Sequence, residues 1–152
     1  MPSPTDPSSA GRRLFVAGAV LAGLGVALGA FGTHALTPRV PPDRIATWET
    51  AVRYHLVHAL ALLILGLARN RWPVPALDRA GGLILAGTAV FAGSLYLLVL
   101  TDTPALGAVT PVGGLLLLAG WTLTAWALGR SDAAPRGAER TGERKDPPPE
   151  GR

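Results

Sequence analysis

The sequence predicts an all-α fold, namely an integral membrane four-helix bundle with an amphipathic extension before the second span. Hydrophobic residues make up 49% of the 152 residues and charged residues only 16%, whereas soluble domains average about 25% charged residues. The charges are also clustered, with long uncharged stretches between the clusters. In hydrocarbon each backbone N–H and C=O group must be paired internally, so these stretches predict helices.

Four stretches are candidates for membrane spans, since a bilayer core takes roughly 17–25 helical residues. Three uncharged stretches contain 20, 22 and 27 residues: Leu14–Thr33, Ala80–Thr101 and Thr103–Gly129. A fourth, Tyr54–Ala68, has 15 residues, and it is long enough if the stems of Arg53 and Arg69 extend to the membrane interface. We therefore expect spans at about 14–34, 51–69, 80–101 and 105–129.

The basic residues predict the orientation of these spans. Four spans place both termini on one side, and that side carries eleven of the fourteen Lys and Arg residues. By the positive-inside rule, both termini should lie in the cytoplasm. Residues 1–13 and 130–152 are expected to be disordered tails, because they lack the apolar residues that a fold would bury.

Glycines predict where the helices touch, because helix association in lipid depends on close packing of small residues. The first span contains a GxxxG pattern, and glycines also mark the third span and the start of the fourth. We expect six glycines at static helix contacts: Gly25, Gly29, Gly32, Gly93, Gly113 and Gly114.

The segment before the second span predicts a helical extension with one polar stripe. Pro38, Pro41 and Pro42 exclude a helix in the first part of this segment. Asp43, which follows them, is a suitable N-cap. From Arg44 onward the chain is expected to be helical, with Trp48 as an interfacial anchor. Thr110 is a similar cap candidate before Pro111, which either starts or kinks the fourth helix. The stripe covers a sector of about 100° and contains Thr47, Ala51, Tyr54, His55 and His58.

Polar residues from all four spans share one expected depth, in the outer leaflet. Ionisable groups at membrane depth are costly and mark either a functional site or a polar network. The candidate polar site consists of His34, Tyr54, His55, His58, Tyr96 and Thr110.

Three hypotheses compete for this cluster. His34, His55 and His58 could coordinate a metal ion, although no carboxylate clearly shares their face. Alternatively, the histidines and Tyr96 could bind a proton or a small ligand, since histidine titrates near neutral pH. The third hypothesis is structural, with the side chains joined by hydrogen bonds between helices. The sequence contains no recognisable set of nucleophile, base and orienting group, so we expect no catalytic residues and no cofactor.

Several strings of residues resemble one known family. They are Gly29–His34, Glu49–His55 with His58–Leu62, Phe91–Tyr96, and Leu106–Gly114 with Gly120-Trp121. Together they resemble the domain of unknown function 423 family, which includes small bacterial inner-membrane proteins and the eukaryotic transmembrane protein 256. The resemblance covers roughly residues 14–127 and implies a four-helix membrane protein whose molecular activity is not established.

The sequence thus predicts a small multi-pass membrane protein with a His/Tyr site in the outer leaflet. One alternative is a transporter or binder of a small ligand, proton or metal ion, and another is a structural or assembly partner in a membrane complex. The expected partners are the lipid bilayer, a small-molecule or ion ligand and further copies of the chain. Nucleic acid is not expected, because the basic residues are distributed by membrane side.

Overall fold

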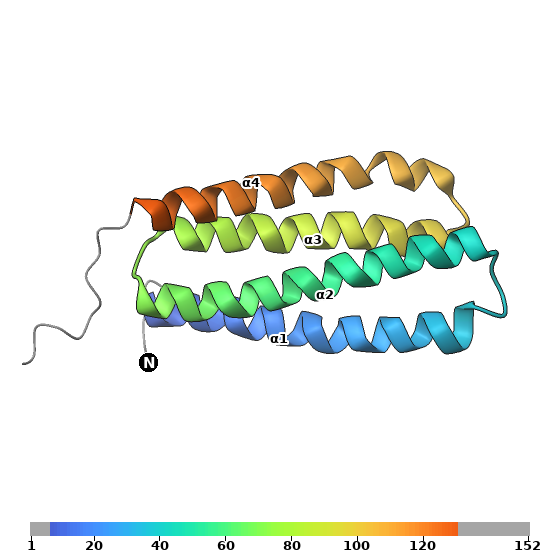
Figure 1. Cartoon of the computed structure of the whole chain (residues 1–152), viewed down its shortest axis with the longest axis horizontal. Coiled ribbons are helices and arrows are strands. Elements are labelled where there is room, and N and C mark those ends of the chain that lie inside the picture. The colour runs from blue at the N-terminus through green and yellow to red at the C-terminus, as the bar shows by residue number, and fades with distance from the viewer. Residues whose placement is uncertain (1–6, 131–152) are drawn as a thin grey trace, which may run out of the picture.

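The computed structural model describes residues 7–130, and nearly all of this part is helical (Figure 1). Each of the four long helices is long and apolar enough to cross a membrane. The predicted all-α fold with four membrane helices is therefore confirmed. The long helices are α1 (Pro7–Phe31), α2 (Pro42–Arg71), α3 (Ala76–Thr101) and α4 (Thr110–Gly129), and two short helices are η1 (Gly32–Leu36, a π-helix) and η2 (Pro104–Ala108, a 3-10 helix).

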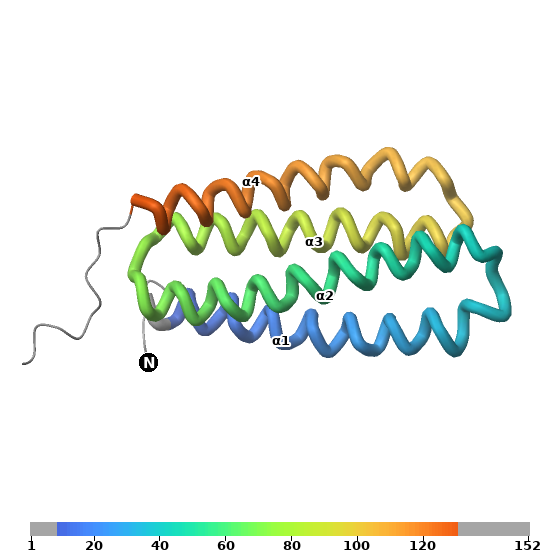
Figure 2. The backbone as a smooth tube through the Cα atoms, viewed as in Figure 1, coloured from blue at the N-terminus to red at the C-terminus, as the bar shows by residue number. Residues whose placement is uncertain are grey.

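The helices run up and down and pack in chain order. In the described residues α1 packs on α2, α2 on α3 and α3 on α4, whereas α1 and α4 do not pack against each other. The backbone trace in Figure 2 shows the two ends of this arrangement. The start of α1, the turn between α2 and α3 and the end of α4 share one end, called here the terminal end. The other end carries η1 and η2 and is called here the connection end.

The first helix is longer than its uncharged stretch. It begins at Pro7, so residues 7–13, which the sequence assigned to a tail, are helical. The remaining tail residues, 1–6 and 131–152, lie outside the described part of the chain.

The second helix contains the predicted extension without a break between the extension and the span. Pro41 is the N-cap and Pro42 the first helical residue, so Asp43 lies in the first turn and is not the cap. Proline suits this place because it has no N–H to leave unpaired. Trp48, expected at the membrane interface, is instead 1% exposed. Its Nε1 donates to the Leu28 carbonyl at 2.9 Å, so this indole joins α2 to α1.

Some of the six expected packing glycines lie at very close helix contacts, and others do not. A Cβ atom at Gly25 would lie 2.6 Å from Leu56, and one at Gly32 would lie 2.5 Å from Trp48. Gly113 faces the Phe91 backbone with no room for a side chain. Cβ atoms at Gly29 and Gly114 would meet their neighbours at ordinary distances of 3.5 Å and 3.9 Å, and one at Gly93 would meet nothing within 4 Å.

Two ion pairs tie helices together at the two ends. At the connection end Arg44 of α2 reaches Asp102 at 2.6 Å. Asp102 ends α3 in the left-handed conformation, with φ 47°. At the terminal end Arg69 reaches Asp78 across the turn at 2.8 Å. The Arg69 side chain is only 6% exposed, so its guanidinium is buried against Asp78.

Candidate functional site

His55 of α2 and Tyr96 of α3 form a buried polar pair between two helices. The His55 Nδ1 atom lies 3.2 Å from the Tyr96 hydroxyl, and the two residues are 5% and 9% exposed. The rings meet edge to face with centroids 6.0 Å apart. The structure therefore brings together two of the six predicted site residues at hydrogen-bonding distance.

The surroundings of this pair come from three helices. One side is closed by Trp48, whose ring stacks at a tilt on Tyr96 with centroids 4.6 Å apart. On the α1 side, a Cβ atom at Gly25 would lie 3.8 Å from the His55 ring. The Leu21 backbone also interacts with the ring, but no group lies within hydrogen-bonding geometry of His55 Nε2.

The chemistry of the pair follows from this unpartnered atom. A neutral imidazole has one N–H donor and one acceptor nitrogen. If Nδ1 accepts from the tyrosine hydroxyl, Nε2 is a donor, and if Nδ1 donates, Nε2 is an acceptor. In both cases Nε2 has no partner in good hydrogen-bonding geometry, although the Leu21 backbone lies close enough to interact with the ring. The His55 ring can therefore take one further hydrogen-bonding partner.

His58, one turn further along α2, is fully bonded within the chain. Its Nδ1 donates to the Tyr54 carbonyl at 2.7 Å, and its Nε2 accepts from Trp121 Nε1 of α4 at 3.3 Å. Because a carbonyl only accepts and an indole N–H only donates, these partners fix the neutral Nδ1–H tautomer. His58 thus links α2 to α4.

An apolar groove lies beside His58, over α3 and between α2 and α4. Tyr54 stacks on Phe91 with ring centroids 4.4 Å apart, and Trp121 forms the opposite wall. The groove has a volume of about 520 Å³ and is otherwise lined by Pro111, Gly114, Leu115, Leu117 and Leu118. Tyr54, the third α2 residue of the predicted site, belongs to this groove and not to the His55–Tyr96 pair.

Thr110 and His34, the remaining predicted site residues, lie elsewhere. The Thr110 hydroxyl lies 2.9 Å from the Ser94 hydroxyl, so Thr110 joins α3 to α4. Thr110 does not cap α4, because this helix has no side-chain cap. His34 lies exposed in η1. No group of three potential metal-binding side chains occurs in residues 7–130, so the three histidines do not meet in one metal site.

Sequence reasoning missed the partners that complete these groups. Trp121, Phe91 and Ser94 bond or stack with predicted residues, and Trp48 closes the buried pair. Of these four residues, only Trp48 has a position in the sequence pattern that could have predicted its place. It precedes Ala51, His55 and His58 at helical spacing and so lies on the buried face. The other partners come from distant helices, whose facing residues no local pattern reveals.

Comparison with known proteins agrees with this architecture. A family model described as "Protein of unknown function (DUF423)" matches residues 28–114. A UPF0382 membrane protein of Staphylococcus aureus is 42% identical over 112 residues, which cover 74% of this chain and 91% of that protein. The UPF0382 membrane protein YwdK of Bacillus subtilis is 40% identical over 109 residues, or 71% of this chain and 89% of YwdK. No solved structure is significantly similar to the chain. The chain therefore belongs to the DUF423 family of membrane proteins of unknown function.

Proposed function

We propose that this protein is a bacterial inner-membrane protein that binds a proton, an ion or a small polar ligand at the His55–Tyr96 pair. The observation that carries the proposal is the His55 Nε2 atom, which is buried without a hydrogen-bond partner. A buried polar atom without a partner calls for a missing water, ion or ligand. His55 is the only histidine with this property, since both His58 ring nitrogens are bonded and His34 is exposed.

The proposal also places the pair in the outer half of the membrane, with both termini in the cytoplasm. Its support is the basic residues at the terminal end, which include Arg12, Arg13, Arg71, Arg79 and Arg130. An excess of Lys and Arg marks the cytoplasmic side of a membrane protein. His55 lies in the part of α2 that is nearer the connection end.

The orientation can be tested by labelling, because the natural chain has no cysteine. A single cysteine at Thr103→Cys would lie at the connection end and one at Arg71→Cys at the terminal end, and both positions are exposed. In intact cells a membrane-impermeant maleimide should label only Thr103→Cys. Labelling of Arg71→Cys alone would show that the orientation is the opposite of the one proposed.

A structural or assembly role is the second candidate, and His58 favours it. This histidine joins α2 to α4 with both nitrogens bonded inside the chain. Hydrogen bonds between membrane helices contribute about 0.6 kcal/mol each on average. A protein with only this role would lose stability on histidine replacement but bind no ligand at His55.

Native mass spectrometry of the purified full chain, with metal analysis, separates the two candidates. We expect a small bound species with the natural chain, loss of that species with His55→Phe and its retention with His58→Phe. Both variants remove a buried imidazole from α2, so they are matched. The same bound species in all three chains, or none in any of them, would contradict the binding of an ion or small ligand at His55. Loss of the species with His58→Phe alone would show that the site is the groove beside Phe91.

A further inference from the structure

We infer that a groove between α1 and α2 at the connection end binds the headgroup of a zwitterionic aminophospholipid, with its phosphate on Arg53 and its ammonium group on Glu49. This groove, called here the interface groove, has a volume of about 400 Å³. It is separate from the His55–Tyr96 pair, which does not line it. The inference therefore does not depend on the proposed function.

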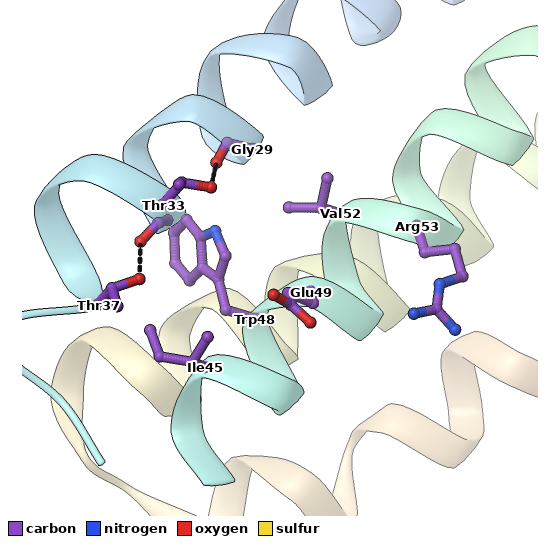
Figure 3. A pocket seen from close by; sticks show the side chains of 9 residues that line it. Gly29, Thr33, Thr37, Ile45, Trp48, Glu49, Val52 and Arg53 are labelled. Atoms are coloured by element: carbon purple, nitrogen blue, oxygen red, sulfur yellow. Dashed lines mark hydrogen bonds between the residues drawn. The ribbon is translucent and has the colours of Figure 1, made fainter. Parts of the chain in front are cut away.

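The charges of the interface groove come from one face of α2. Glu49 and Arg53 are one helical turn apart, where oppositely charged side chains often pair. Within residues 7–130 no ion pair joins these two charges, whereas Arg44 pairs with Asp102 and Arg69 with Asp78. Figure 3 shows the Glu49 carboxylate and the Arg53 guanidinium separated along α2. A separate negative and a separate positive group are thus available to a ligand.

The opposite wall comes from the end of α1 and from η1. The Thr33 hydroxyl donates to the Gly29 carbonyl at 3.2 Å and the Thr37 hydroxyl to the Gly32 carbonyl at 3.1 Å (Figure 3). Each hydroxyl has used its single proton, so its oxygen is left to accept. Two such oxygens opposite Glu49 suit the N–H groups of a primary ammonium ion. Gly32 and Thr33 of this wall belong to the π-helix η1, and π-helical turns are frequent at functional sites.

The floor is apolar and fixed in place. Trp48 lies against Gly32, where a Cβ atom would come within 2.5 Å of its ring, and its Nε1 is held by the Leu28 carbonyl. Val52 and Ile45 extend this apolar surface. A floor of this kind suits the glycerol and upper acyl carbons of a lipid whose headgroup lies at the charged rim.

Charge complementarity selects this lipid class over others. A guanidinium binds phosphate strongly through its fork of N–H donors. An anionic lipid without an amine would satisfy Arg53 but would leave Glu49 facing its negative charge. A phosphoethanolamine headgroup carries its phosphate and its ammonium group at the two ends of a short linker, so the two groups can meet Arg53 and Glu49, which lie one helical turn apart on α2, at the same time. A fully methylated amine would keep the positive charge but lose the N–H donors for Glu49, Thr33 and Thr37.

The test uses the full chain in vesicles of equal phosphatidylethanolamine and phosphatidylglycerol, extracted in mild detergent for native mass spectrometry. We expect the natural chain to retain phosphatidylethanolamine about fivefold over phosphatidylglycerol, a preference of about 1 kcal/mol. Glu49→Gln should remove the preference while phosphate binding persists. Arg53→Gln should lower retention of both lipids. Phosphatidylcholine should bind more weakly than phosphatidylethanolamine.

Matched controls lie at the same end of the molecule. Asp43→Asn and Arg44→Gln change the same charges on α2 outside the interface groove, since neither residue lines it. Both should keep the fivefold preference. The inference is overturned if the natural chain shows no preference for the amine, or if Glu49→Gln behaves as Asp43→Asn does. A dimer that survives detergent and is lost only in the groove variants would instead identify a second copy of the chain as the occupant, and would equally overturn it.

Discussion

Trp48 packs its indole against the Tyr96 ring with centroids 4.6 Å apart while its Nε1 donates to the Leu28 carbonyl at 2.9 Å. One side chain of α2 therefore contacts both α1 and α3. It also separates two features, because Trp48 forms the floor of the interface groove on one side and closes the His55–Tyr96 pair on the other.

Replacement of this indole should weaken the contact between α1 and α2. Trp48→Phe removes the hydrogen bond to Leu28 and leaves a small cavity beside Tyr96, so we expect a destabilisation of about 1–2 kcal/mol. Reversible unfolding of the purified chain in mixed micelles measures this loss. Trp126→Phe is the control, because Trp126 is exposed on α4 and its replacement should change stability little. Equal stability of Trp48→Phe and the natural chain would show that the indole does not join the helices.

The close contact of α3 and α4 at Gly120 should be sensitive to a single methyl group. A Cβ atom there would lie 2.6 Å from Ile84 and 3.2 Å from the Ala80 carbonyl. Gly120→Ala should therefore destabilise the chain by about 1–3 kcal/mol through overpacking. Gly93→Ala adds the same methyl group where nothing lies within 4 Å, and it should be neutral or slightly stabilising. Equal unfolding free energies for the two variants would contradict the close contact.

The two ion pairs should differ in their contribution to stability. Arg69 is 6% exposed, so Asp78→Ala leaves a buried guanidinium without its partner, and we expect a loss of about 3 kcal/mol. The pair of Arg44 and Asp102 is more exposed, and Arg44→Gln should cost about 0–1 kcal/mol. Equilibrium unfolding at low and high salt measures both. A larger loss for Arg44→Gln than for Asp78→Ala would contradict this difference in burial.

The link between α2 and α4 should depend on both partners of one hydrogen bond. Trp121→Phe removes the donor to His58 Nε2 and His58→Phe removes the acceptor, and each should cost about 0.6 kcal/mol or somewhat more. A double-mutant cycle of the two changes should show coupling of similar size. Strictly additive losses would mean that the 3.3 Å contact contributes no net stability.

The fold class was predictable because hydrocarbon imposes a strong constraint. In lipid a long uncharged stretch must pair its backbone N–H and C=O groups internally, which favours a helix. The helices do cover those stretches. Helix contacts were less predictable. Gly113 and Gly93 look alike in sequence, yet only Gly113 faces a neighbouring backbone, because the rotation of α3 and α4 depends on their partners.

The predicted site was only partly recovered for the same physical reason. Periodicity placed His55 on the inward stripe of α2, and the structure pairs it with Tyr96. The sequence also placed His34 at a similar depth. His34 lies in the π-helix η1 and not in a regular α-helix, and its side chain is exposed. The side-chain direction at a helix end depends on how the chain leaves the helix, which spacing alone does not determine.

The central claim, that His55 Nε2 holds a species from outside the chain, is tested most directly by ¹⁵N NMR. The full chain is labelled at histidine and reconstituted in lipid, and the His55 signals are assigned by their loss in His55→Gln. We predict an Nε2 shift typical of a hydrogen-bonded ring nitrogen, together with exchange of its partner's proton in deuterated buffer. A His55 ring bonded only at Nδ1, with Nε2 unbonded and unaffected by deuterated buffer, would contradict the account and leave the pair a structural link.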